Sequence, residues 1–285
     1  MADATDAHPE HPHPTGDSPG KAAAFFDLDR TLISGASAFA FGIAAWRNDI
    51  VPTRELLGDA VNAMIFRLTG GSDERSQETR DRILRAVAGQ QVDDLVALGD
   101  DIIPTLLAKV RPEAQSLLEM HADAGRDRFI VSATPIEIVE DFARALEVEG
   151  GIGTRSEIVD GCYTGELDGP FVYGAGKAEA VEKLAAERGY DLRLSYAYSD
   201  SSSDLPMLEL VGHPVAVNPD RTLERVAHQR GWPVVVFSRK AKRVIKTTTA
   251  ASGAAALAVA SYFLGRRHGR IATESRPSQL DLLRP

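Results

Sequence analysis

Two carboxylates stand one residue apart directly after an apolar run near the start of the chain. The run covers residues 22–26 and leads into a D-x-D-x-T motif made by Asp27, Asp29 and Thr31. Because α/β proteins carry their chemistry at the carboxyl ends of strands, a buried strand that ends in two carboxylates indicates a reactive site. One of the two would act as a nucleophile toward phosphorus, and the other as acid and base. The alternative for so short a motif is a surface turn rich in aspartate.

A hydroxyl group follows a second candidate strand at residues 128–131. The strand leads into Ser132, and the residues after it are typical of a helix start. Thr134 is predicted as the N-cap, Pro135 as the first helical residue and Glu137 as the partner in a capping box. Free N–H groups at a helix N-terminus favour a phosphate, and the Ser132 hydroxyl adds a donor. The alternative is an ordinary capped turn.

A lysine and two further carboxylates follow later in the chain. Lys177 comes after two glycines at the start of an amphipathic stretch, where it would meet a phosphate as a point charge, although most such lysines are solvated. Asp200 and Asp204 lie in a serine-rich loop after a candidate strand at 195–198. Such oxygen ligands suit Mg²⁺, which binds few protein carboxylates and keeps water and phosphate as its other ligands.

Taken in order, these motifs resemble those of the haloacid dehalogenase-like (HAD) hydrolase superfamily, subfamily IB, which contains phosphoserine phosphatase. The resemblance spans roughly residues 22–238. It implies that Asp27 is the nucleophile and a Mg²⁺ ligand. It also implies that Asp29 is the general acid and base, with a backbone carbonyl that meets the metal. The implied activity is hydrolysis of a phosphomonoester through an aspartyl-phosphate intermediate.

The same resemblance gives roles to the later motifs. Thr31, Ser132 and Lys177 would hold the phosphoryl group. Asp200 would ligate Mg²⁺, and Asp204 would support the ion from outside its ligand shell or through water. These charges are needed because a phosphate monoester dianion repels an approaching carboxylate until cations and N–H groups neutralise it.

One position separates this chain from phosphoserine phosphatases. Those enzymes place a glutamate nine residues past the nucleophile to bind the substrate ammonium group, whereas this chain has Ala36 there. An alanine cannot pair with an ammonium, so phosphoserine becomes one candidate among small phosphomonoesters. Lipid phosphates are a further candidate because of the uncharged segment near the C-terminus, described below. Arg67 would meet an anionic substrate group, or it is a solvated charge at the end of a helix.

The elements that must position these residues form an α/β pattern. Strands and helices alternate over 21–34 and 109–238, which predicts a doubly wound, mostly parallel sheet. An insertion at 35–108 interrupts them and, by the resemblance, is a helical cap over the active site; the alternative is a rigid helical domain. Helical spacing is found in this insertion at 37–46, 53–68, 76–87 and 92–107. In the core we expect helices at 110–125 and 137–146, a hairpin around residues 160–161, and strands at 215–219 and 233–237.

Both ends of the chain differ from this core. Residues 1–20 and 271–285 are predicted to be tails. Residues 247–265 carry no charge and lie between basic residues, within a predicted hydrophobic helix at 239–270. Their length suffices to span a bilayer, although Ala, Gly, Thr and Ser dominate. Three alternatives stay open: a transmembrane anchor, which we favour, an interfacial helix, and an Ala-rich helix packed on the core.

Composition sets further limits on function. The 285 residues suffice for about two domains, and a 44% hydrophobic and 26% charged content is ordinary for a globular protein. A net charge of −9 disfavours nucleic acid as a partner. The single cysteine, Cys162, excludes an intramolecular disulfide, and without a recognisable secretory signal the cytoplasm is the expected compartment.

The sequence therefore favours a Mg²⁺-dependent phosphatase acting on a small or lipid phosphomonoester. A phosphotransferase that passes the phosphoryl group to an alcohol is an alternative within the enzyme class. The rival from another class is a membrane-tethered binding or regulatory protein on the same fold. Because a decayed site is expected to lose one of its carboxylates, the presence of both Asp27 and Asp29 favours the enzyme.

Overall fold

The protein is built around one seven-stranded sheet, seen in a computed structural model. The structure describes residues 20–37, 40, 44, 80, 81, 84, 85, 87–237 and 245–246. The strands of the sheet are β1 (Ala23–Asp27), β2 (Asp127–Pro135), β3 (Gly150–Thr154), β6 (Tyr196–Ser199), β7 (His213–Val217), β8 (Val234–Val235) and β9 (Ile245–Lys246). Their order is β3-β2-β1-β6-β7-β8-β9, and every pairing is parallel except that of β9 with β8.

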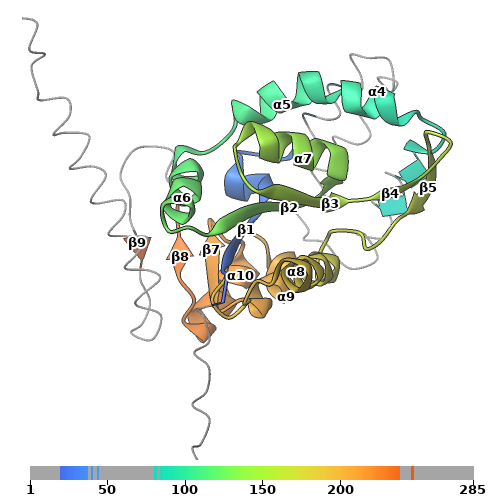
Figure 1. Cartoon of the computed structure of the whole chain (residues 1–285). Coiled ribbons are helices and arrows are strands. Elements are labelled where there is room, and N and C mark those ends of the chain that lie inside the picture. Colours follow the sequence, from blue (N-terminus) through green and yellow to red (C-terminus); the bar gives the residue numbers. More distant parts are fainter. Residues whose placement is uncertain are drawn as a thin grey trace, which may run out of the picture.

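Helices cover both faces of this sheet (Figure 1). One face carries α6 (Pro112–Asp123) and α7 (Ile136–Ala145). The other carries α8 (Ala175–Arg188), α9 (Leu205–Leu210) and α10 (Arg221–Arg230). The chain order of the strands reverses between β1 and β6, which makes this the topological switch point where such folds place their ligands. The predicted doubly wound α/β fold is confirmed.

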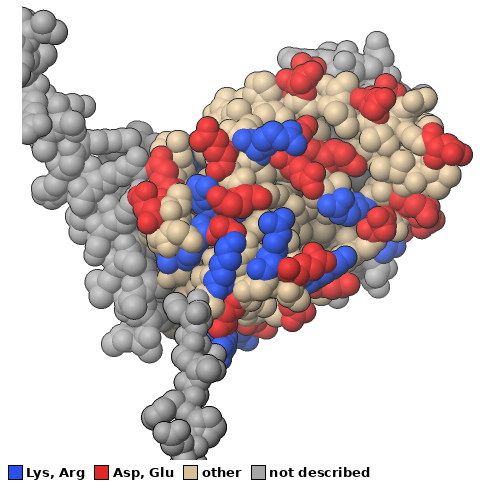
Figure 2. Space-filling view, viewed as in Figure 1, with Lys and Arg blue, Asp and Glu red and all other residues tan. Residues whose placement is uncertain are grey.

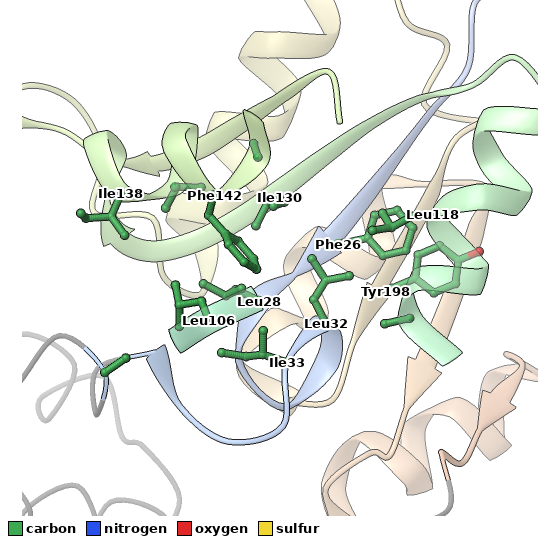
Figure 3. Packing of buried hydrophobic residues seen from close by; sticks show 14 of the residues in the cluster. Phe26, Leu28, Leu32, Ile33, Leu106, Leu118, Ile130, Ile138, Phe142 and Tyr198 are labelled. Carbon is green, nitrogen blue, oxygen red and sulfur yellow. The ribbon is translucent and has the colours of Figure 1, made fainter. Parts of the chain in front are cut away.

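Side chains of β1 alternate between two apolar cores, which explains why its sequence has no polar residues in alternation. Ala24 and Phe26 point to the core under α6 and α7, while Ala23 and Phe25 belong to the core under the other helices. Figure 3 shows the first core, where Phe26 lies beside Tyr198. Their rings stack with centroids 4.6 Å apart. Burial on both faces fixes the register of β1, and hence the place where Asp27 emerges.

The end of the insertion packs on α7. The helix predicted at 92–107 is confirmed as two consecutive helices, α4 (Val92–Ala97) and α5 (Gly99–Leu107), which meet at Leu98. Gly99 follows this junction, and glycine is a weak helix former. The rest of the predicted insertion falls mostly outside the described residues, and so does Arg67. The division of the chain into core, insertion and tails stays a prediction.

A separate hairpin touches the end of the insertion. Strands β4 (Ser156–Val159) and β5 (Cys162–Leu167) pair in antiparallel fashion, as predicted around residues 160–161. Asp160 and Gly161 have φ angles of 51° and 79°, the left-handed values that a tight type I′ turn requires. The N–H of Val92 donates to the carbonyl of Gly161 at 3.0 Å and joins the hairpin to α4.

The predicted capping box before α7 is wrong. Strand β2 continues to Pro135, and Pro135 itself is the N-cap, with no side-chain cap hydrogen bond. The Thr134 hydroxyl instead contacts Ser132 and Ser37, which removes it from the helix end. Tertiary partners thus override the local capping signal.

Of the hydrophobic helix predicted at 239–270, the structure describes only residues 245–246. Residues 245–246, inside the predicted 239–270 helix, form β9 at the edge of the sheet. The uncharged segment 247–265 lies outside the described residues. Among the helices that the structure does describe, none has the length and apolarity to cross a membrane. On the face displayed in Figure 2, acidic and basic side chains interleave.

A buried histidine links α6 to β6. His121 is fully buried; its Nε2 lies 2.7 Å from the Tyr198 hydroxyl, and the Nε–H of Arg126 donates to its Nδ1 at 2.7 Å. Since Nδ1 accepts a hydrogen bond, the ring is neutral. Burial, aided by the charge of Arg126, lowers the pKa of His121 to about 3.

We expect this histidine to make folding stability depend on pH. In the unfolded chain it takes up a proton below its ordinary pKa of 6.5, whereas the folded protein excludes that proton down to about 3. Its contribution is therefore complete above pH 6.5 and is lost as pH falls. Between about pH 7 and pH 5 this costs roughly 2 kcal/mol. Urea unfolding at pH 7 and pH 5 gives the loss of unfolding free energy between the two pH values. This loss should be smaller in His121→Gln than in wild type by roughly 2 kcal/mol. The exposed His228→Gln is the control, and equal pH dependence in His121→Gln and wild type would refute the expectation.

Candidate active site

The predicted site residues meet at the carboxyl ends of the central strands. Asp27 is the last residue of β1 and lies in register with Val131, directly before Ser132. Asp200 follows the end of β6 on the other side of β1. The residues that the sequence analysis took from distant motifs are thus brought to one edge of the sheet, at its switch point.

Lys177 joins two of the aspartates. Its Nζ donates to Asp27 Oδ1 at 2.5 Å and to Asp204 Oδ2 at 2.7 Å, and the lysine is only 4% exposed. The lysine lies in the first turn of α8. At Gly176, the residue before it, the helix packs closely against the backbone of Phe171. A Cβ at that position would lie 2.0 Å from the carbonyl oxygen of Phe171, so only glycine fits. This lysine is therefore a buried charge rather than a solvated one.

Burial and charge act in opposite directions on this pair. Burial raises the pKa of Asp27 well above its ordinary value, and the neighbouring aspartates add to this, while Lys177 opposes it. Burial alone would lower the pKa of Lys177, but Asp204 and Asp27 outweigh it and raise that pKa above its ordinary range. Lys177 thus stays protonated and supplies a fixed positive charge beside Asp27.

Arg30 binds Asp200, the first carboxylate of the serine-rich loop after β6. Its Nε donates to Asp200 Oδ2 at 2.5 Å, and its backbone has a φ angle of 60°, which an arginine rarely adopts. Asp200 is 3% exposed. Burial raises the pKa of Asp200 to about 6, although Arg30 opposes the shift. Arg30 was not predicted as a site residue, because no local pattern relates it to an aspartate 170 residues further along the chain.

A chain of hydroxyl groups runs beside Asp29. The Ser132 hydroxyl donates to Thr134 Oγ1 at 3.0 Å, and Thr134 Oγ1 lies 3.1 Å from Ser37 Oγ. The N–H of Ser37 donates to Asp29 Oδ1 at 2.7 Å. Burial raises the pKa of Asp29, and hydrogen bonds from Ser37 partly offset this. Ser37 was not predicted as a site residue; it lies six residues past Thr31, the last residue of the motif.

Thr31 completes the predicted set. It is 2% exposed, and within the described residues its buried hydroxyl has no hydrogen-bond partner. An unpaired buried hydroxyl is costly, so this one is available to a ligand. A phosphoryl oxygen fits this donor.

Asp220 holds the loop that carries Asp200, and it was not predicted from the sequence. Its N–H donates to the carbonyl of Asp200 at 2.8 Å, and its Oδ2 accepts the N–H of Ser202 at 2.7 Å. The same carboxylate caps α10. An aspartate directly before a helix is a recognisable capping signal, but its contact with the Asp200 loop is tertiary.

The donor set fits a divalent cation. Within the described residues no three His, Cys, Asp or Glu side chains form a ready-made metal cluster. Mg²⁺ does not need one, since it takes one or two carboxylates and fills its shell with water, carbonyl and phosphate oxygens. With all four aspartates ionised, they exceed the two cationic side chains by two negative charges, and with Asp29 protonated the excess is one; a divalent cation would offset it in either state. The charged set is Asp27, Asp29, Asp200 and Asp204 with Lys177 and Arg30.

Comparison with protein-family models assigns the chain to a family. A family model described as haloacid dehalogenase-like hydrolase matches residues 24–209, a span that includes every predicted site residue. The chain belongs to this family. The predicted resemblance is thereby confirmed, and so is the expectation of an enzyme, a phosphatase of the HAD superfamily.

Individual relatives agree with the family assignment. The chain is 40% identical over 253 residues to a phosphoserine phosphatase of Mycobacterium tuberculosis, covering 87% of this chain and 82% of that protein. It is 39% identical over 267 residues to a probable phosphatase of the same organism, covering 89% and 93%. A solved structure from Bordetella pertussis, described as of unknown function, is 29% identical with a TM-score of 0.66 and covers 75% and 97%.

Proposed function

We propose that this HAD enzyme is a Mg²⁺-dependent hydrolase of small phosphomonoesters that works through a phosphorylated Asp27. The observation that carries the proposal is the contact of Asp27 with Lys177, a buried cation that also pairs with Asp204. A buried carboxylate beside a fixed positive charge suits attack on a phosphate dianion. The two mycobacterial phosphatases named above support the same reaction.

In the first half-reaction Asp27 attacks phosphorus in line with the leaving alkoxide. Lys177 and the hydroxyls of Thr31 and Ser132 bind the phosphoryl oxygens, whose charge would otherwise repel the nucleophile. Mg²⁺ held by Asp27, Asp200 and the backbone carbonyl of Asp29, with support from Asp204, would neutralise the remaining phosphate charge. Asp29 donates its proton to the leaving oxygen. The first product then departs as an alcohol.

In the second half-reaction the same Asp29 acts as a base. It has just lost its proton, so it removes one from the water that attacks the aspartyl-phosphate. Asp27 is released with inorganic phosphate, and Asp29 is protonated again. Burial raises the pKa of Asp29, which lets it hold a proton more readily than an exposed aspartate.

The substrate is proposed to be a small phosphomonoester without a required ammonium group. The mycobacterial relative at 40% identity is named for phosphoserine. Ala36, however, offers no charge for an ammonium at the position where phosphoserine phosphatases are expected to carry a glutamate. Lipid phosphates remain a prediction that depends on the segment 247–265.

A panel of phosphomonoesters with Mg²⁺ and with chelator tests this function. We expect release of phosphate that needs Mg²⁺ and that favours phosphoserine over comparable phosphates without an amino group by less than about 10-fold, or 1.4 kcal/mol. Strong selectivity for phosphoserine would contradict the substrate assignment. Binding without phosphate release would point to a regulatory protein, and a phosphorylated alcohol formed from added glycerol would point to a phosphotransferase.

Membrane association through 247–265, with a cytoplasmic catalytic domain, is tested by truncation. A chain that ends at Phe237 keeps every proposed site residue and the parallel strands of the sheet, so it should fold and hydrolyse a soluble substrate. We expect the full chain in the membrane fraction and the truncated chain in the soluble fraction. Equal fractionation of the two active proteins would exclude the anchor, and loss of folding would show that the segment packs on the core.

A further inference from the structure

We propose that Ser37 orients Asp29 for proton transfer and that its backbone N–H performs this role. The inference rests on the proposed phosphatase function and adds a residue to it. Ser37 is a positioning residue, since it acts on the substrate through Asp29. It lies outside the D-x-D-x-T motif, at the first residues of the insertion.

The contact fixes one oxygen of the carboxyl group. The Ser37 N–H donates to Asp29 Oδ1 at 2.7 Å, and Ser37 is only 4% exposed. A carboxyl group that accepts an N–H on Oδ1 carries its transferable proton on Oδ2, because the proton would clash with the donor at Oδ1. The N–H therefore selects both the rotamer of Asp29 and the oxygen that faces the leaving group.

Backbone hydrogen bonds hold the loop that leads to Ser37 at the base of the insertion. The N–H of Arg30 donates to the carbonyl of Gly35 at 3.0 Å, closing the loop that leads to Ser37. Gly35 has a φ angle of 107°, which favours glycine. Where the chain leaves and re-enters the core, Ser34 N–H donates to the carbonyl of Lys109 at 2.8 Å. These backbone bonds set the place of the Ser37 N–H independently of its side chain.

The Ser37 hydroxyl makes a second connection. It lies 3.1 Å from Thr134 Oγ1, which accepts a hydrogen bond from Ser132. Ser37 thus contacts the proposed acid on one side and the phosphate-binding strand on the other. The N–H and the hydroxyl serve different partners, so the two functions are separable by mutation.

Two substitutions separate them. Ser37→Pro removes the N–H, and proline is favoured at the first position of a helix, where Ser37 lies. Ser37→Ala keeps the N–H and removes the hydroxyl. We would measure kcat/KM, which reports the steps up to phosphoenzyme formation, for p-nitrophenyl phosphate and p-methoxyphenyl phosphate. The nitrophenolate leaves without a proton, whereas the methoxyphenolate needs one.

We expect Ser37→Pro to lose roughly 10- to 100-fold on p-methoxyphenyl phosphate and less than about 3-fold on p-nitrophenyl phosphate. Ser37→Ala should keep the wild-type ratio of the two rates. Equal losses on both substrates in Ser37→Pro, or the same ratio change in Ser37→Ala, would overturn the role of the N–H.

Two controls keep the test decisive. Circular dichroism and thermal unfolding check the folding of Ser37→Pro. If it does not fold, lactic acid incorporated at position 37 removes the N–H but keeps the alanine side chain, and it is compared with Ser37→Ala. Asp29→Asn should show the steepest leaving-group dependence. If Asp29→Asn shows no leaving-group dependence, the proposed role of Asp29 fails. If Asp29→Asn shows this dependence but neither Ser37→Pro nor the lactic acid variant does, only the Ser37 proposal fails.

Discussion

Asp27→Asn is expected to lower turnover by at least about 10³-fold and to abolish any phosphorylated form of the enzyme. An amide has nearly the shape of the carboxylate, but it is a poor nucleophile toward phosphorus. It also lacks the charge that pairs with Lys177 at 2.5 Å. The measurement is phosphate release under saturating Mg²⁺, with exposed Asp123→Asn as the matched control. Near-normal turnover in Asp27→Asn would rule out the proposed nucleophile.

Asp29→Asn should fail differently. General acid and base catalysis contributes about 10² to 10⁴ to such a rate. With p-nitrophenyl phosphate, whose leaving group needs no proton, the first half-reaction should survive while hydrolysis of the intermediate slows. The variant should therefore accumulate phosphoenzyme, which Asp27→Asn cannot form. This contrast distinguishes the two roles, which a loss of activity alone would not.

Lys177→Met is expected to lower both stability and turnover. The lysine is buried between Asp27 and Asp204, so its removal leaves buried carboxylates without their partner. Breaking such a pair costs about 3–5 kcal/mol in unfolding free energy. Turnover should fall at least about 10²-fold because the phosphoryl charge loses its fixed cation. Urea unfolding at neutral pH with chelator measures the first effect.

Mg²⁺ should return part of the stability lost in Lys177→Met, since it binds the same excess of negative charge. Exposed Lys183→Met on the same helix is the control and should change the unfolding free energy by less than about 0.5 kcal/mol. If Lys177→Met were as stable as wild type in chelator, the carboxylates would not depend on this charge.

Local signals predicted much of the fold and site. The apolar run of β1 predicts a strand buried on both faces, so the motif that follows it lies at the carboxyl end of that strand. Asp160-Gly161 predicted its hairpin because left-handed backbone favours those residues. The glycines before Lys177 marked the start of the amphipathic stretch that forms α8. In each case the physical cause lies within a few residues of sequence.

The misses are contacts that link distant parts of the chain. Thr134 matched a capping pattern, but Ser37 and Ser132 compete for its hydroxyl. Arg30 reaches Asp200 across 170 residues, and Asp220 holds the same loop from the N-terminus of α10. No periodicity or spacing encodes such a meeting. It follows only from the strand order, which brings β1 between β2 and β6.

The central claim is that the phosphoryl group passes through Asp27. Wild-type enzyme and Asp29→Asn would be mixed with p-nitrophenyl phosphate and Mg²⁺, quenched in acid within milliseconds, digested, and analysed by mass spectrometry. We expect one phosphorylated peptide, the peptide that contains Asp27, with more of it in Asp29→Asn than in wild type. Phosphate on any other residue, or turnover by wild type with no phosphorylated peptide in either protein, would contradict the account.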